Sequence, residues 1–237
     1  MVFGFIKKLT GKDNDLVKKG DELFYRGEYD KALAKYNETL MINKDNGDAK
    51  RGIEKIKEIE NLKRRGYILF IECKYSDALE RYEEVLKLNP NDKKVKGRIE
   101  DINKIIMLKE EGNKLMSKKE YDKALIKFEE VLKLNPNDLE VKNKINEINR
   151  IKTEKAFKYY VELGDKEFKN NNYLKAKDYY NTALAYKNDL KVKEKIKEVE
   201  KFIKIRTLKE EGKRLSNNGH YTNALKKFEE VRSEEHT

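Results

Sequence analysis

Residues Lys109–Pro136, KEEGNKLMSKKEYDKALIKFEEVLKLNP, decide the fold of this chain. The small residue Gly112 lies in a first helical segment, and Ser117-Lys118 then interrupts the helical pattern. In the second segment, an alanine, an aromatic residue and a leucine share one helical face because they follow at intervals of four: Ala124, Phe128 and Leu132. Pro136 ends this segment. The stretch therefore predicts two antiparallel helices that approach closely through small residues.

The same pattern occurs five times along the chain. Counted from a glycine, a tyrosine follows after nine residues, an alanine after twelve and an aromatic residue after sixteen. The glycines are Gly20, Gly66, Gly112, Gly164 and Gly212. The aromatic residues are Tyr36, Tyr82, Phe128, Tyr180 and Phe228, and we expect them to fill the gaps between hairpins. Two copies close with Asn-Pro-Asn-Asp, at residues 89–92 and 135–138.

In order and spacing, these columns resemble the tetratricopeptide repeat family, over roughly residues 14–231. Five copies in register make the signal far more specific than a single short motif. The resemblance implies an all-α fold, an α-solenoid of antiparallel helical hairpins that forms an elongated, right-handed array. It also implies a protein-binding scaffold rather than an enzyme.

The chain departs from the family in the length of its repeat. The family repeats every 34 residues, whereas the glycines here are spaced by 46, 46, 52 and 48 residues. The added residues precede each glycine and continue the helical pattern, so we predict lengthened first helices alternating with short second ones. Residues 92–118 would form one rod of about 40 Å. The alternative is an extra short helix with a kink near Ile105, and the longer residues 138–170 are more prone to bend.

The predicted organisation has three parts. Residues 1–12 form an N-terminal amphipathic segment, and residues 13–231 form the solenoid. Its repeats lie near residues 13–44, 48–90, 92–136, 138–188 and 190–231. Residues 232–237, Arg-Ser-Glu-Glu-His-Thr, break the repeat pattern after Val231 and are encoded by a common sequencing adapter. We therefore interpret them as an artefact tail, after which the natural protein would continue.

Composition narrows the class of partner. The chain of 237 residues has 42% charged residues and a net charge of +11, with 55 basic and 44 acidic residues closely mixed. Such mixing is typical of solvated helix faces rather than of a nucleic-acid-binding block. No apolar run approaches the roughly 20 residues of a membrane span. The single cysteine, Cys73, is expected to be a free thiol in a turn, and it fits a cytoplasmic location.

Signatures of catalysis are missing from the sequence. It contains two histidines, His220 and His236, which leaves little for histidine-based metal sites or triads. Thr10-Gly11-Lys12 lacks the glycine-rich loop of a phosphate site, and the carboxylates of residues 43–54 are out of register for calcium. We expect no enzymatic activity, cofactor, metal or small-molecule substrate.

The groove of first helices is the expected binding surface. Its candidate residues are Lys63, Tyr67, Lys109, Asn113, Met116, Arg206, Lys209 and Lys213. They predict a patchily basic groove for acidic segments or C-terminal tails of partner proteins. Lys109 and Asn113 match the first two positions of the family's carboxylate clamp, but Glu162 and Glu210 do not fit the later ones.

Two classes of function follow. The first is a scaffold or adaptor that binds peptide or helical segments of other proteins. The second is a basic, elongated structural spacer or a nucleic-acid-associated protein. In the N-terminal segment Met1–Leu9, the apolar stripe of Val2, Phe5, Ile6 and Leu9 either caps the first hairpin or touches a membrane peripherally.

Overall fold

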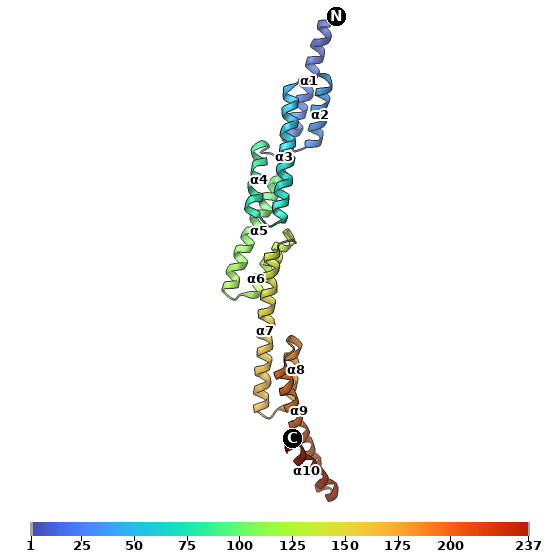
Figure 1. Ribbon diagram of the computed structural model, residues 1–237, viewed down its shortest axis with the longest axis vertical. Helices are drawn as coiled ribbons and strands as arrows, with labels where there is room; N and C mark the ends of the chain where they lie inside the picture. Colours follow the sequence, from blue (N-terminus) through green and yellow to red (C-terminus); the bar gives the residue numbers. More distant parts are fainter. Residues whose placement is uncertain (1, 237) are drawn as a thin grey trace. The chain divides into compact units, whose positions relative to one another are not determined.

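The computed structural model describes residues 2–236, with side chains described for residues 11–236. The described residues form ten helices and no strands. In chain order the helices are α1 (Val2–Tyr25), α2 (Tyr29–Ile42), α3 (Gly47–Ile71), α4 (Tyr75–Leu88), α5 (Lys93–Ser117), α6 (Tyr121–Leu134), α7 (Leu139–Lys169), α8 (Tyr173–Tyr186), α9 (Leu190–Asn217) and α10 (Tyr221–His236). Successive helices pair as antiparallel hairpins (Figure 1), which confirms the all-α solenoid.

Long and short helices alternate as predicted. The first helices α3, α5, α7 and α9 contain 25, 25, 31 and 28 residues, whereas α2, α4, α6 and α8 contain 14 each. In α5 the added residues are continuous with the rest of the helix, so the alternative of a separate short helix near Ile105 is wrong. The helix starts where Asp92 caps it, because the side chain of Asp92 accepts a hydrogen bond from the Val95 N–H.

Each hairpin reverses through the same turn. Seven residues after the repeat glycine, the backbone has a positive φ between 59° and 78°. The residues concerned are Gly27, Cys73, Lys119, Asn171 and Gly219. The N–H of each donates to the carbonyl three residues earlier, and the next N–H donates five residues back, as in Gly27 to Phe24 and Glu28 to Leu23. These two bonds define a Schellman motif, so every hairpin closes with a left-handed residue. Cys73 is one of these turn residues and is a free thiol, as predicted.

We expect glycine to stabilise the turns that lack it. Lys119 holds φ at 60°, a conformation that costs an L side chain roughly 1 kcal/mol. Lys119→Gly should therefore raise the free energy of unfolding by about 0.5–1 kcal/mol. The neighbouring Lys118 has φ −82° and is the matched control, because glycine there gains nothing and adds freedom to the unfolded chain. Chemical denaturation of both variants measures the difference; equal shifts would contradict the assignment.

The core repeats the alanine and aromatic columns. Ala32, Ala78, Ala124 and Ala176 are fully buried, and Ala224 is nearly so. The aromatic rings contact the next hairpin, as the sequence suggested, at Tyr36 and Tyr180, and they also pack within their own hairpins. Each lies against the glycine of its own hairpin, as Phe128 does against Gly112. Tyr36 also contacts Gly52 at the start of the next hairpin. The glycines are thus required by close approach of a ring, not by backbone conformation.

Two glycines of α5, Gly112 and Gly97, allow the packing role of a repeat glycine to be distinguished from the low helix propensity of glycine. A Cβ at Gly112 would lie 2.6 Å from Cε1 of Phe128, which is fully buried, whereas a Cβ at Gly97 would meet nothing within 4 Å. Gly97→Ala should stabilise the protein by about 0.5–1 kcal/mol. Gly112→Ala should destabilise it by about 1–3 kcal/mol because the ring must move. Thermal and urea unfolding test the pair, and stabilisation by both substitutions would contradict the close contact.

The chain divides into two compact units, residues 1–145 and 146–237, and the division falls within α7. The first unit contains the hairpins α1–α2, α3–α4 and α5–α6, with the start of α7. The second contains the rest of α7 with α8, and the hairpin α9–α10. Rings of α7, α8 and α9 pack together in the second unit, where Tyr173 stacks on Phe202 at 5.1 Å between centroids.

The two ends of the chain carry predictions that remain open. α1 is helical from Val2, but the side chains of the apolar stripe Val2–Leu9 lie outside the described ones. α10 continues to His236, and Lys204 and Lys209 of α9 pair with Glu234 and Glu235. The adapter origin of residues 232–237 stays a prediction, which an uninterrupted genomic reading frame encoding them would contradict.

Candidate interaction surfaces

A buried polar network joins the three hairpins of the first unit. The Tyr29 hydroxyl and the Lys63 ammonium donate to Oδ2 of Asp92, at 2.8 and 2.9 Å. The Asn89 amide donates to the Tyr29 hydroxyl oxygen at 3.0 Å and to the Phe24 carbonyl at 2.7 Å. Lys63 also lies over the Tyr29 ring, 5.0 Å from its centroid. One carboxylate therefore connects the first hairpin turn, helix α3 and the start of α5.

The network recurs with every residue 46 positions later. Tyr75 and Lys109 donate to Asp138 at 2.9 Å each, and the Asn135 amide donates to Tyr75 and to the Phe70 carbonyl. Asp138 again accepts the N–H three residues on, from Val141. Lys109 makes a further bond of 2.8 Å to Glu140. The Asn-Pro-Asn-Asp segments are therefore connectors between hairpins and not only helix ends.

The acceptors of both networks are held as carboxylates. Burial alone would raise the pKa of Asp92, but hydrogen bonds from Lys63, Tyr29 and the Val95 N–H outweigh it, and the pKa lies below its ordinary 3.8. The pKa of Asp138 is lowered in the same way. Burial would lower the pKa of Lys109, but its bonds to Glu140 and Asp138 raise it. These groups therefore stay charged at neutral pH and bind one another.

Protonating Asp92, or replacing it with a neutral residue, should lower the stability of the first unit. A group with a lowered folded pKa stabilises the protein above its unfolded pKa, and the contribution is lost as pH falls below about 4. Asp92→Asn should cost about 2 kcal/mol at pH 7, because Lys63 and Tyr29 lose their charged acceptor. The variant should also lose part of the acid sensitivity between pH 5 and 3. Urea unfolding across this range is the measurement.

The control for Asp92→Asn is Glu38→Gln, which removes an exposed carboxylate paired with Lys35. A surface pair of this kind contributes about 0.5 kcal/mol or less. Equal losses in the two variants would show that Asp92 does not connect the hairpins.

The structure divides the predicted groove residues between two roles. Lys63 and Lys109 belong to the networks, and the Lys109 side chain is only 15% exposed. Lys109 already binds two carboxylates, so it does not offer the free cation that a carboxylate clamp needs. Met116 is half-buried. The remaining predicted residues are exposed: Tyr67, Asn113, Arg206, Lys209 and Lys213. Of these, Arg206 pairs with Glu210 and Lys209 with Glu235.

Lys63 and Tyr67 meet in a basic hollow between α3, α4 and α5. Its volume is about 450 Å³. It is lined by Lys63, Tyr67, Tyr82, Lys93, Lys94, Val95, Gly97, Arg98 and Asp101. Lys93 and Lys94 are exposed and pair with no carboxylate of the described residues, and Arg98 lies 3.8 Å from Asp101. Because Lys63 is already paired with Asp92, three further cations, Lys93, Lys94 and Arg98, stand against the single carboxylate Asp101, an arrangement that attracts anions.

Lys109 and Asn113 line a second hollow, which recurs in the second unit. It lies between the hairpin turn at Cys73–Asp77 and one side of α5. The corresponding hollow of the second unit lies between Asn172–Lys175 and α9, where Arg206 lines it. Both hollows thus combine a hairpin turn with the first helix of the next hairpin. Their charges are mixed, so charge does not select a partner at either one.

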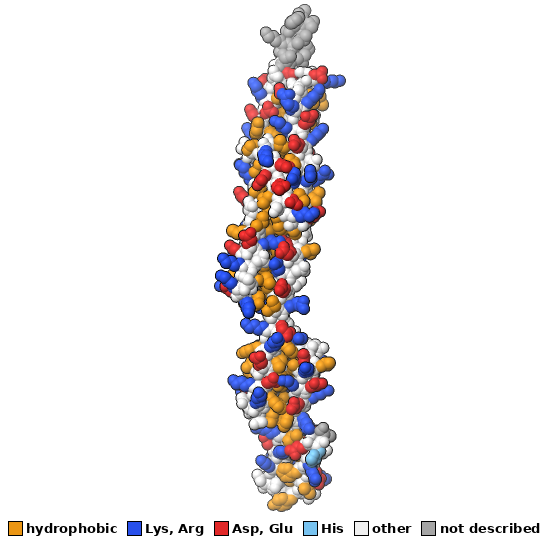
Figure 2. Space-filling model, turned by 60° about the vertical axis from the view of Figure 1, so that its left-hand side comes forward, with side chains coloured by type: hydrophobic (Ala, Val, Ile, Leu, Met, Phe, Trp, Pro, Cys, Tyr) orange, Lys and Arg blue, Asp and Glu red, His pale blue; other side chains and the backbone are white. Residues whose placement is uncertain are grey.

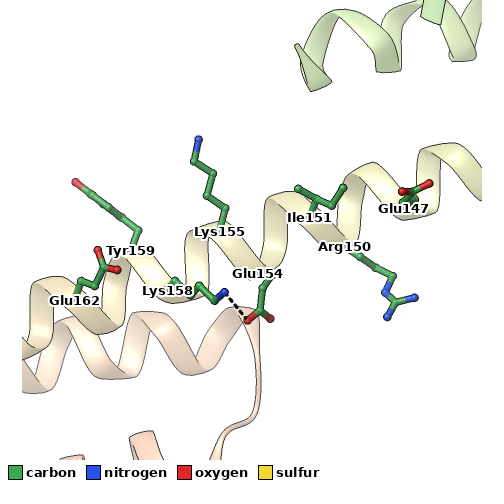
Figure 3. A pocket seen from close by; sticks show the side chains of 8 residues that line it. All are labelled: Glu147, Arg150, Ile151, Glu154, Lys155, Lys158, Tyr159 and Glu162. Carbon is green, nitrogen blue, oxygen red and sulfur yellow. Dashed lines mark ion pairs between the residues drawn. The ribbon is translucent and has the colours of Figure 1, made fainter. Parts of the chain in front are cut away.

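The largest of these hollows lies along α7 in the second unit (Figure 3). Its lining residues are Glu147, Arg150, Ile151, Glu154, Lys155, Lys158, Tyr159 and Glu162. Lys155 and Tyr159 project from the same side of the helix in Figure 3, whereas Lys158 turns to Glu154, at 3.9 Å. Acidic and basic side chains are equal in number, three of each. This face is therefore solvated without a charge preference.

The rest of the described surface agrees with this picture. Figure 2 shows Lys and Arg side chains interspersed with Asp and Glu over the face in view. The described residues include no group of three or more His, Cys, Asp or Glu side chains placed to hold a metal ion. Within the described chain, every helix is too short or too polar to cross a membrane. The basic hollow is thus the most one-sided charged feature among the described hollows.

These hairpins, with their stacked small and aromatic residues, define an α-solenoid repeat protein. The model of the family described as "Tetratricopeptide repeat" matches residues 59–92 and 108–138. Each match starts within a long first helix and ends at an Asn-Pro-Asn-Asp segment. The added residues therefore lie at the N-terminal ends of the first helices. The two matched segments are therefore tetratricopeptide repeats, and repeats of this kind generally mediate protein–protein interactions.

Comparison with individual proteins adds little to this assignment. No curated protein sequence matches the chain significantly. The crystal structure of the P58(IPK) tetratricopeptide repeat domain is 15% identical, with a TM-score of 0.37 over 95% of this chain and 74% of that one. The MamA RS-1 ArsTM double mutant is 18% identical, with a TM-score of 0.17 over 95% of each chain.

Proposed function

We propose that this protein is a non-catalytic scaffold that binds acidic segments of partner proteins through its first helices. The observation that carries the proposal is the basic hollow, where exposed Lys93 and Lys94 join Arg98 and the half-exposed ring of Tyr67. An aromatic surface beside cations suits an acidic segment that also carries apolar side chains. A cytoplasmic location is part of the proposal and is supported by the free thiol Cys73.

The alternative is a structural spacer or a nucleic-acid-associated protein. The net charge of +11 favours it. The closely mixed charges weigh against it, because a nucleic-acid surface needs a run of cations that follows the phosphate backbone. The tyrosines of the repeat columns are also mostly packed in the core and do not stack in a row on the surface.

Affinity capture from the source cells separates the two functions. We expect partner proteins to be retained after nuclease treatment and to elute as salt rises from about 0.1 to 1 M, because the screening length shortens from about 10 to 3 Å. Capture that nuclease abolishes would favour the nucleic-acid alternative. Binding that salt leaves unchanged would contradict acidic partners.

A charge-reversal pair tests the surface itself. Lys93→Glu/Lys94→Glu should weaken retention of the same partners about tenfold, through lost attraction to acidic segments. The matched control is Lys18→Glu/Lys19→Glu, which changes two exposed lysines of α1 by the same charge. Quantitative binding to purified partners should distinguish the variants. Equal weakening by both would place the interaction elsewhere.

A further inference from the structure

In two hairpins, the buried tyrosine of the aromatic column donates a hydrogen bond to an aspartate of the same hairpin. The Tyr36 hydroxyl donates to Asp21, and the Tyr180 hydroxyl donates to Asp165, at 2.6 Å in each case. Each aspartate directly follows the repeat glycine. In the α7–α8 hairpin, Lys195 of α9 pairs with the same carboxylate and lies over the Tyr180 ring. The α7–α8 hairpin thus builds a carboxylate site from a phenol and a cation, and its own Asp165 occupies the site.

The α3–α4 hairpin keeps the donors but lacks the carboxylate. Tyr82 occupies the place of Tyr180, and Arg98 stands six residues after the capping Asp92, as Lys195 stands six after Asp189. Tyr67 takes the position of the aspartate. Tyr82 is largely buried but lines the basic hollow, where its hydroxyl reaches solvent and has no hydrogen-bond partner among the described residues. A hydroxyl without a protein acceptor and a guanidinium whose carboxylate partner, Asp101, is 3.8 Å away therefore share this hollow.

The aromatic column and the residue after the glycine vary together in the other hairpins. Where the aromatic residue has no hydroxyl, as in Phe128 and Phe228, the residue after the glycine is Asn113 or Lys213, not aspartate. Aspartate occurs where a tyrosine needs it. The α3–α4 hairpin is the exception, because it combines a tyrosine that needs an acceptor with Tyr67, which supplies no charge.

We propose that the basic hollow binds a carboxylate side chain of a partner protein, which accepts from Tyr82 and pairs with Arg98 as Asp165 does with Tyr180 and Lys195. Lys93 and Lys94 at the rim attract further acidic residues of the same segment. Tyr67, half exposed, packs against the segment. This inference rests on the proposed scaffold function and names the chemical group that the scaffold recognises.

A carboxylate fits this hollow better than the phosphates of a nucleic acid. The equivalent place in two other hairpins already holds a carboxylate that accepts from the tyrosine hydroxyl, and in the α7–α8 hairpin a cation, Lys195, also pairs with it. A phosphodiester carries one negative charge, as a carboxylate does, so the charges of the hollow alone do not separate the two ligands. A single-stranded oligonucleotide is therefore included in the test as a competitor.

The decisive variant is Tyr67→Asp, which supplies the carboxylate from within. Because Asp21 and Asp165 hold this position in other hairpins, we expect the variant to fold with an unchanged or higher melting temperature. The probe is a fluorescein-labelled peptide with blocked ends and alternating Glu and Ala, measured by fluorescence anisotropy on the full chain. Wild type should bind it at least tenfold more tightly than the Gln–Ala peptide. Tyr67→Asp should lose about tenfold in affinity, the size of one charge-assisted interaction.

Two further variants control for net charge and for folding. Asn113→Asp adds the same charge at the same position beside Phe128, which has no hydroxyl, and should change affinity less than twofold. Tyr82→Phe keeps the ring against Gly66 but removes the hydroxyl, and should weaken binding about tenfold. Full affinity in Tyr67→Asp or Tyr82→Phe, or equal loss in Asn113→Asp, would overturn the inference. Tighter binding of the oligonucleotide, lost in Tyr67→Asp, would overturn it in favour of a phosphate site.

The results distinguish a failure of the carboxylate site from a failure of the scaffold function. Cellular partners that bind Tyr67→Asp as well as wild type would remove the carboxylate site and leave the scaffold function intact. Absence of any protein partner, combined with loss of the Glu peptide in Tyr67→Asp, would keep the carboxylate site and remove the scaffold function.

Discussion

The first unit depends on a carboxylate buried between hairpins. Asp92 caps helix α5 with one oxygen and accepts from Tyr29 and Lys63 with the other. A buried carboxylate without partners would cost several kcal/mol, so the helix start, the preceding lysine helix and the earlier hairpin turn must stay together. The hydrophobic columns bring the helices into contact, but apolar contacts tolerate small shifts of one helix along its neighbour. The network is more sensitive to such shifts, because Tyr29 and Lys63 both have to reach the same oxygen of Asp92.

This constraint explains why repeat length matters. The two networks are related by 46 residues because α3 and α5 have the same length. Helix α7 is six residues longer, which turns its face by about 240°. Lys155 keeps the distance of Lys109 from the capping aspartate, whereas Val161 keeps its distance from the repeat glycine. The residue at the network offset and the residue at the glycine offset therefore lie on different sides of α7. The division between the compact units falls within this helix, between residues 145 and 146.

Much of the fold could be predicted from sequence because its determinants are local. The glycine, alanine and aromatic columns fix the hairpins, and the absence of a breaker in residues 93–117 predicts one long helix. The roles of Lys63 and Lys109 could not be predicted in the same way, because their partners lie 29 residues away and meet only after packing. A periodic residue on a helix looks equally suited to a groove or to an ion pair. The signal in the sequence is the constant offset of 46 residues, which separates Lys63 from Lys109 and Asp92 from Asp138.

Differences between the copies carry information that the shared columns do not. The aromatic ring is required everywhere for packing against glycine, but the phenol hydroxyl is not, since Phe128 and Phe228 serve as well. Where a hydroxyl is present it needs an acceptor, and Asp21 and Asp165 supply one. Tyr82 keeps its hydroxyl at an open hollow where water can solvate it, so leaving out the aspartate costs little in stability. A partner that brings a carboxylate to this place meets donors already held in position by the core, and binding needs little reorganisation. A core column of the repeat can in this way become a recognition site by the loss of a single acidic side chain.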